Sequence, residues 1–165
     1  MNVIITGGAP ISGFAGRVAL AGDAHSYPML GLLCDYLHEC GIAYTDLGQR
    51  DVNAAAAAVC EAVLSGACSR CIVVTCQGND AVLALNKHLG VRCALGDKPT
   101  RVTLGRREND VNTLAIATDT TAFGVAMESV WKFLAEPFAG GVFARRNADV
   151  AALDDMYARG DHGCA

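Results

Sequence analysis

Side chains able to do acid/base chemistry stand directly after several apolar runs of this sequence. Asp23, Asp97 and Asp119 each follow such a run, and the loop Cys-Gln-Gly-Asn-Asp at 76–80 follows another. If these runs are strands of one open parallel sheet, their carboxyl ends meet at one edge, which is where such sheets bind ligands. The spacing therefore predicts one site built from these loops.

The loop at 76–80 offers two groups that could accept a proton near neutral pH. Cys76 could do so as a thiolate and Asp80 as a carboxylate, whereas the hydroxyl of Thr75 could not. Backbone amides at the start of a helix after Gly78 would stabilise negative charge on a bound oxygen. We expect proton transfer here and prefer Cys76 as the base. Both groups also have structural explanations, as a packed thiol and as a first-turn helix residue.

The elements that must position these groups alternate between short apolar runs and alanine-rich amphipathic stretches, which is typical of βα units around a parallel sheet. Five such units are predicted. Asp51 or Asn53 could cap the second helix, Pro99 suits the first turn of the fourth, and Asp119 could cap the fifth. The predicted strands are 17–21, 43–47, 71–75, 91–95 and 113–117, and the predicted helices are 27–40, 51–64, a third that ends near 88, 99–107 and 119–134.

Composition restricts the class of protein. The 165 residues, 52% of them hydrophobic, suffice for one domain, and no apolar run approaches the roughly 20 residues that span a bilayer. A net charge of -4 with 6% aromatic residues excludes a basic, aromatic nucleic-acid surface. The N-terminus does not have the pattern of a secretion signal, so we expect a cytoplasmic protein with reduced thiols. Cys68 and Cys71, a C-x-x-C without a second pair at zinc-site spacing, are interpreted as buried structural thiols.

We divide the chain into three parts. Residues 1–16 are interpreted as an N-terminal arm, because Pro10 and Ile11 spoil the likeness of their glycine-rich run to a dinucleotide-binding loop. Residues 17–136 form the α/β domain. Pro137 breaks the last helix, so residues 137–165 are predicted to be a C-terminal arm that contacts a partner subunit and carries a short helix near 149–157.

Five sequence pieces, in this order and spacing, carry a resemblance to a known family. They are Val-Ala-Leu-Ala-Gly-Asp at 18–23, Glu-Ala-Val-Leu-Ser-Gly at 61–66, Asn-Lys-His-Leu-Gly-Val-Arg-Cys-Ala-Leu at 86–95, Glu-Asn-Asp-Val-Asn at 108–112 and Phe-Ala-Gly-Gly-Val-Phe-Ala-Arg-Arg at 138–146. Together they resemble the family of type-B ribose-5-phosphate isomerases and galactose-6-phosphate isomerases.

The resemblance implies a fold and an activity. The fold is a Rossmann-like, three-layer α/β/α sandwich with a five-stranded parallel sheet. The activity is interconversion of a small phosphorylated aldose and ketose through a cis-enediolate, without a metal or an organic cofactor. The resemblance also implies homodimers or homotetramers whose sites are completed by both chains, and the family has precedent for hetero-oligomers of two related chains.

At the predicted mouth of the site, this chain departs from the family pattern. The family has an Asp-His pair after the first strand, whereas Ala24 separates Asp23 from His25 here. In an ungapped alignment Thr75 takes the place of one branch's catalytic cysteine, with Cys76 one residue later. The glutamate of the other branch falls on Ala81, next to Asp80. Gly78 and Asn79 join Asp23 and His25 as the predicted substrate-binding residues of this edge.

Further along the chain, Glu108 stands where the family has its ring-opening histidine, and Asn109 follows it as in the family. A carboxyl group can act as a general acid or base if its pKa is raised. Val142-Phe143 replaces an Arg-His pair, which leaves Arg145 and Arg146 to bind a phosphate. The substitutions cluster at the predicted site. They leave open a standard isomerase, an isomerase of a non-standard sugar, and a catalytically degenerate binding or partner subunit.

Overall fold

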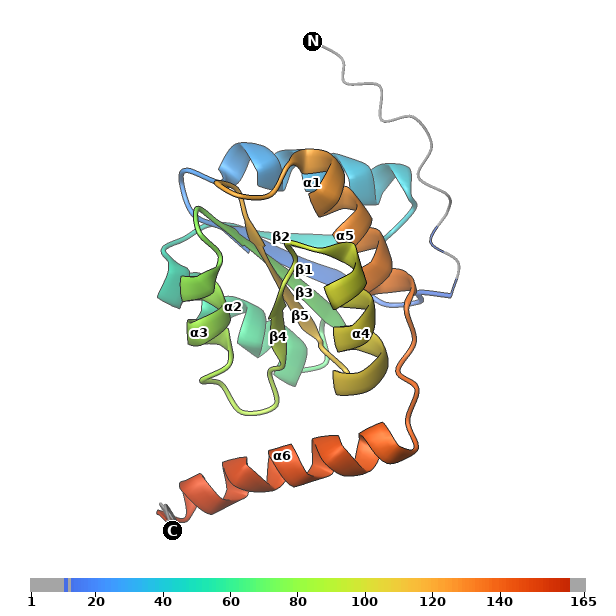
Figure 1. Ribbon diagram of the computed structural model, residues 1–165. Coiled ribbons are helices and arrows are strands. Elements are labelled where there is room, and N and C mark those ends of the chain that lie inside the picture. The colour runs from blue at the N-terminus through green and yellow to red at the C-terminus, as the bar shows by residue number, and fades with distance from the viewer. Residues whose placement is uncertain (1–10, 12, 161–165) are drawn as a thin grey trace.

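The computed structural model of the protein describes residues 11 and 13–160, which form a parallel β-sheet between two layers of helices, with one further helix set apart (Figure 1). The strands are β1 (Val18–Gly22), β2 (Tyr44–Gln49), β3 (Arg70–Thr75), β4 (Cys93–Leu95) and β5 (Thr113–Ala117). The helices are α1 (Tyr27–Glu39), α2 (Val52–Leu64), α3 (Asn79–Leu85), α4 (Pro99–Asn109), α5 (Phe123–Ala135) and α6 (Val142–Ala158). The predicted three-layer α/β/α fold is confirmed.

Burial on both faces explains why the central strands appear in the sequence as continuous apolar runs. Every residue of β1 and β5 is buried, and so is every residue of β3 after Arg70. A parallel sheet covered by helices on both sides requires this, because no strand face meets water. The edge strands β2 and β4 are only partly buried, and the sequence there is less uniform.

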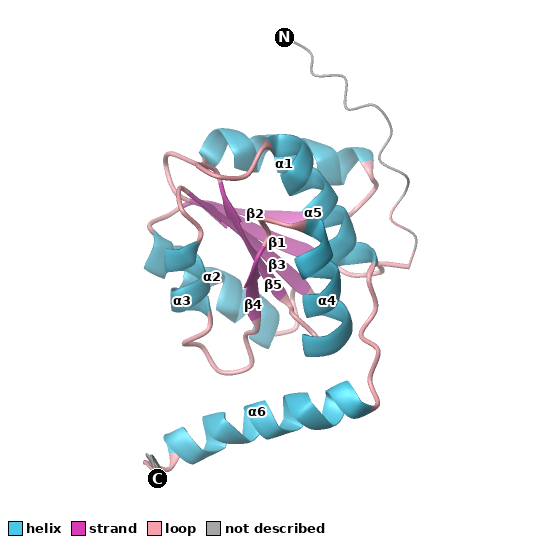
Figure 2. Cartoon of the chain, in the orientation of Figure 1, coloured by secondary structure: helices cyan, strands magenta, loops and turns pink. Residues whose placement is uncertain are grey.

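Helices α1, α4 and α5 cover one face of the sheet, and α2 and α3 cover the other (Figure 2). On the first face, Leu33 and Phe133 of the helices pack in one cluster with Ile72 of β3. On the second, small side chains such as Ala55 of α2 form a cluster with Val73 of β3. The alanine-rich stretch of the sequence is therefore the inward side of α2.

The strand order β2-β1-β3-β5-β4 separates the connections that leave the carboxyl ends of β1 and β3. We call the space between the loops after β1, β3 and β5 the crevice, and its outer rim the mouth. From β1 the chain crosses to β2 on one side, and from β3 it crosses to β4 on the other. The loops after β1 and β3 thus lead away from each other, which defines the topological switch point where such sheets bind ligands. Asp23 and the loop at 76–80 stand at this point.

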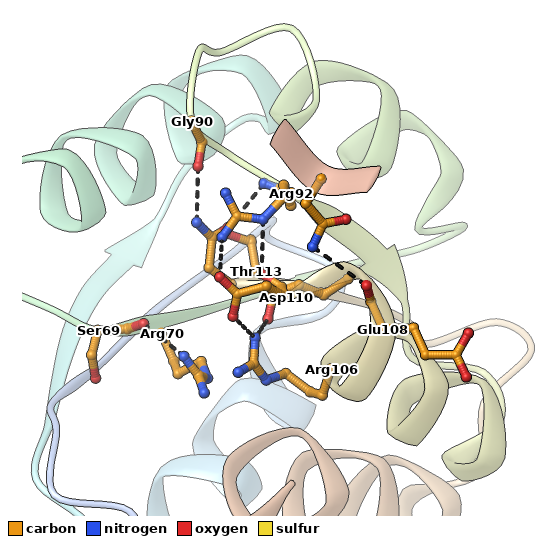
Figure 3. Close-up of polar contacts among 11 residues, drawn as sticks. Ser69, Arg70, Gly90, Arg92, Arg106, Glu108, Asp110 and Thr113 are labelled. Carbon is orange, nitrogen blue, oxygen red and sulfur yellow. Dashed lines mark hydrogen bonds and ion pairs between the residues drawn. The ribbon is translucent and has the colours of Figure 1, made fainter. Parts of the chain in front are cut away.

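At the opposite end of the strands, an ion-pair network fixes the turn between α4 and β5 (Figure 3). We call this side of the sheet the amino edge. Asp110 ends α4 in the left-handed conformation, with φ of 49°. Its carboxylate oxygens lie 2.9 Å from Nη1 of the buried Arg106 and 2.7 Å from Nη2 of Arg92. Arg106 also donates to the carbonyl of Val111. Because α4 returns from the carboxyl end of β4, this network lies at the amino ends of the strands.

The C-terminal segment differs from the prediction of a short helix near 149–157. After the Gly140-Gly141 turn, α6 runs for 17 residues, from Val142 to Ala158, with none of them buried. An extended segment separates it from α5, and in Figure 1 it lies apart from the sandwich. Its contact with the domain is made against α4, where the Asn147 side chain donates to the carbonyl of Glu108 at 3.4 Å. Because α6 buries none of its residues, its sequence lacks the regular spacing of apolar residues that would have predicted where the helix starts.

Two helix boundaries also differ from the sequence prediction. Helix α5 begins at Phe123 with Ala122 at its N-cap, so the predicted cap at Asp119 is wrong. Helix α3 ends at Leu85, short of the expected end near His88. The N-cap at Asp51 is confirmed, since its carboxylate accepts from the amides of Asn53 and Ala54.

The predicted arm at 1–16 lies mostly outside the described residues, although Ile11 and Phe14 pack against the core on the α1 and α5 face. Among residues 11 and 13–160, no helix combines the length and apolar character needed to cross a membrane.

Candidate active site

Asp23 ties the loop after β1 to the loop after β3. One carboxylate oxygen, Oδ1, accepts from the amide of Ser26 at 2.7 Å, and the other, Oδ2, accepts from the amide of Cys76 at 3.1 Å. The amide of Asp23 itself donates to the carbonyl of Val74 in β3 at 3.1 Å. Hydrogen bonds to a charged acceptor are stronger than neutral ones, so a single carboxylate holds both walls of the crevice.

Thr75 and Asp80 fix the shape of the loop at 76–80. The buried hydroxyl of Thr75 accepts from the amide of Gly78 at 3.0 Å and donates to Oδ1 of Asp80 at 3.1 Å. Oδ1 of Asp80 also accepts from the amide of Ala81 at 2.8 Å. Gly78 has φ of +77°, and a side chain there would meet Leu95. The loop is therefore a close-fitted turn, and Thr75 acts as its internal brace.

Cys76 is half-buried, and its backbone is bonded to Asp23 in the loop after β1 and to Asp119 in the loop after β5. Its partial burial, and after that the negative charges of Asp23 and Asp119, raise the pKa of its thiol above the ordinary value of 9.0. Cys76 therefore stays largely protonated at neutral pH. The carbonyl of Cys76 accepts from the amide of Asp119 at 2.9 Å, which joins the β3 loop to the end of β5.

The third wall of the mouth comes from the segment after β5. Oδ1 of Asp119 lies 3.7 Å from Nε2 of His25, and both side chains are well exposed. The hydroxyls of Ser26 and Thr118 lie 3.2 Å apart, bridging the loops after β1 and β5. Sequence reasoning missed Ser26 and Thr118, although both are polar residues close behind a buried strand, as Asp23 is.

The other predicted site residues lie at the opposite edge of the sheet. Glu108 and Asn109 are the last two residues of α4, at the amino ends of the strands, and Arg145 and Arg146 are exposed on α6. The side chain of Asn147 in α6 donates a hydrogen bond to the carbonyl of Glu108, so α6 lies near that edge. Figure 3 shows Glu108 at the end of α4. Within one chain, the eleven predicted residues therefore form two separate groups.

A cleft of about 610 Å³ lies beside this second group. It runs between the edge strand β4, helix α4 and helix α6, and the predicted Asn109 lines it together with Asn147. None of the residues of the mouth lines it, so the cleft belongs to the amino edge and not to the switch point.

Comparison with known proteins identifies the relatives of this fold and site. Residues 18–150 match the family described as Ribose/Galactose Isomerase. The chain belongs to this family. It is 30% identical over 145 residues to YwlF of Bacillus subtilis (strain 168), named as a proposed sugar phosphate isomerase, and the match covers 84% of this chain and 97% of YwlF.

Solved structures of the same family superpose on most of the chain. Ribose-5-phosphate isomerase B of Clostridium thermocellum matches with a TM-score of 0.82 and 27% identity, over 86% of this chain and 99% of that one. The type B enzyme of Leishmania infantum matches with a TM-score of 0.80 and 29% identity, over 86% and 98%. The resemblance seen in the five sequence pieces is thus confirmed, and the protein belongs to a family of sugar-phosphate isomerases.

Proposed function

We propose that this protein interconverts a small phosphorylated aldose and its ketose through a cis-enediolate. The observation that carries the proposal is the braced loop after β3, which holds a carboxylate and a thiol at the switch point of a ribose/galactose isomerase fold. The reaction moves one proton between neighbouring carbons, so it needs one base and a means of stabilising an oxyanion.

Asp80 is our proposed base, in place of the Cys76 that the sequence favoured. Its Oδ1 is anchored by Thr75 and by the amide of Ala81, whereas its Oδ2 accepts no hydrogen bond from the part of the chain described. Asp80 is exposed, so a substrate can reach it. Cys76, with its raised pKa, supplies little thiolate at neutral pH and is the weaker candidate.

Backbone amides support the oxyanion part of the proposal. The amides of Cys76 and Gly78 are used within the fold. Asn79 and Asp80 are the first residues of α3, and the first amides of a helix have no partner within it. We assign these two amides to the enediolate oxygen, with Asp23 and His25 beside the remainder of the sugar.

The acidity of the mouth supports an active site shared between two chains. Three carboxylates, those of Asp23, Asp80 and Asp119, stand there, so a phosphate group would need cations from elsewhere. Arg145 and Arg146 are exposed on α6 and lie with Glu108 at the other edge of their own chain. In the proposed homodimer or homotetramer they reach the mouth of a neighbour, where Arg145 and Arg146 bind the phosphate. Glu108 would serve ring opening there, and Asn109 would bind the substrate.

Deuterium exchange tests the reaction directly. The purified protein is incubated in deuterated water with ribose 5-phosphate and with a panel of related aldose and ketose phosphates. We expect conversion of one sugar and deuterium incorporation at its C2. Absence of both ketose formation and exchange across the panel would refute the isomerase and leave a binding or partner subunit of the same fold.

Two matched substitutions then test the base. Asp80→Asn should lower kcat by about 10²- to 10⁴-fold, the usual contribution of a general base. Cys76→Ser should keep most of the activity. Asp51→Asn is the control, because Asp51 is the N-cap of α2 and is not one of the predicted site residues. If Cys76→Ser lowers kcat more than Asp80→Asn does, then the thiol of Cys76 is the base and the assignment to Asp80 is wrong.

A further inference from the structure

Three potential metal ligands meet at the mouth of the crevice, one from each of its walls. They are the imidazole of His25 after β1, the thiol of Cys76 after β3 and the carboxylate of Asp119 after β5. Their ligand atoms all lie within 4.8 Å of one another. The proposed isomerisation makes no use of this combination of nitrogen, sulfur and oxygen donors.

The backbone holds the three residues in register. The amide of Asp119 donates to the carbonyl of Cys76 at 2.9 Å, so these two residues are joined directly. Asp23 accepts from the amide of Cys76 through one oxygen, and through the other it accepts from the amide of Ser26, the neighbour of His25. Hydrogen bonds therefore link the three loops that carry the ligands. Asp23 acts here as carboxylates outside the ligand set do in protein metal sites, where they hold the ligands in position.

The separation between His25 and Asp119 fits two ligands of one ion better than it fits a hydrogen-bonded pair. His25 Nε2 and Asp119 Oδ1 are 3.7 Å apart, beyond hydrogen-bond reach. Two ligands of a tetrahedral zinc ion, with bonds of about 2.0–2.3 Å, lie about 3.3–3.6 Å apart. The side chains of His25 and Asp119 are 69% and 48% exposed, so both can rotate to close the widest separation.

The local charge also favours a cation. The carboxylate of Asp23 accepts from the amide of Cys76 at 3.1 Å, and Asp80 and Asp119 follow β3 and β5, so three carboxylates surround the proposed site. A divalent ion would be attracted to this negative charge, and the thiol would bind it as a thiolate. Imidazole, thiolate and carboxylate together are ligands typical of zinc, while magnesium and calcium prefer oxygen alone.

We propose that His25, Cys76 and Asp119 form a site for one zinc-class divalent ion. Three protein ligands leave the fourth position open to water or to an oxygen of a small molecule, as in zinc sites that exchange ligands. The site shares His25 with the sugar-binding part of the proposed function, but it does not use the base at Asp80. Metal binding can therefore fail while the isomerase activity persists, and the reverse.

Cobalt(II) is the probe, because thiolate ligation to it gives a charge-transfer absorption that carboxylate or imidazole ligation alone does not. Untagged, reduced protein is titrated with Co²⁺ and then with Zn²⁺, which binds more tightly to such donors and should displace it. We expect one Co²⁺ per chain with the thiolate band, loss of the band when Zn²⁺ is added, and no change with excess Mg²⁺.

Single variants assign the ligands. Cys76→Ser should abolish the thiolate band, and His25→Ala and Asp119→Asn should each weaken binding at least about 100-fold, since even outer-shell changes cost 10- to 100-fold. His38→Ala and Cys40→Ser are the matched controls, an exposed histidine and a half-buried thiol elsewhere, and should bind as the parent does. A band that persists in Cys76→Ser, parental affinity in His25→Ala, or no band in the parent protein would overturn the site.

Discussion

The substitution Asp23→Asn tests whether the two oxygens of one carboxylate join the loops after β1 and β3. Each oxygen accepts a different amide, that of Ser26 at 2.7 Å and that of Cys76 at 3.1 Å. Asparagine has one acceptor oxygen and places an NH₂ group where the second oxygen was. One of the two amides must then lose its acceptor and face another donor.

The expected cost follows from that count. A hydrogen bond to a charged group contributes about 1.5–3 kcal/mol, and a donor left without an acceptor in a partly buried position adds a desolvation penalty. Partial access of water to the half-buried Asp23 reduces that penalty. We therefore expect Asp23→Asn to lower the free energy of unfolding by about 2–3 kcal/mol.

Asp51→Asn is the matched control, because Asp51 also accepts two amides but through a single oxygen. Both Asn53 and Ala54 donate to its Oδ1, at 3.0 Å each. Asparagine keeps that oxygen and is as good an N-cap as aspartate, so the change should stay within about 0.5 kcal/mol. Urea unfolding, followed by circular dichroism, measures both. Equal stability of the two variants would refute the two-oxygen clamp.

Three further predictions concern other parts of the fold. Asp110→Asn leaves Arg106 buried without its carboxylate while keeping a residue that tolerates positive φ, so unfolding in urea should be easier by about 3–5 kcal/mol; a cost under about 1 kcal/mol would contradict the network. Burial raises the pKa of Cys71 from 9.0 to about 12, so the thiol favours the folded state at low pH. That stability is lost as pH rises from 9 to about 12, at about 1.4 kcal/mol per pH unit, and the slope in Cys71→Ala should be shallower by this amount, since Cys34 and Cys93 keep raised pKa values of their own; parallel curves for the two proteins would be the contrary result. Gly78→Ala places a methyl group 2.6 Å from a leucine side chain at positive φ and should cost about 2–4 kcal/mol, whereas Gly31→Ala, with open space around it, should not destabilise; equal midpoints would count against the tight turn.

The sheet could be predicted from the sequence because its signals are local. The run at 113–117 coincides with β5, since a strand buried on both faces is apolar throughout. The cap at Asp51 could also be predicted, because its bonds reach only two and three residues along the chain. The fifth helix was placed too early because Asp119 resembles a cap, while its amide is bonded instead to Cys76 of another loop.

The sequence indicated which residues stand at the carboxyl ends of the strands, but not the hydrogen bonds that they make there. The carboxyl ends of the strands identified Asp23 and the loop at 76–80, as topology requires. Two of these hydrogen bonds could not be predicted from residue spacing. One is donated to Asp23 by the amide of Cys76, 53 residues away, and the other is donated by Thr75 to Asp80. Glu108 was grouped with this site from the family pattern, but within one chain it ends α4 at the amino ends of the strands, because a helix after a parallel strand returns there.

A mixed dimer tests most directly whether two chains build one isomerase site. One chain carries Asp80→Asn, the other carries Arg145→Ala and Arg146→Ala, and the two are co-expressed with different tags so that the hetero-dimer is isolated. If the arginines act on the neighbour's loop, one of the two sites in the mixed dimer is intact, and about half of the parent kcat per dimer should return although each variant alone is inactive. A mixed dimer as inactive as its parents would mean that no chain completes another's site.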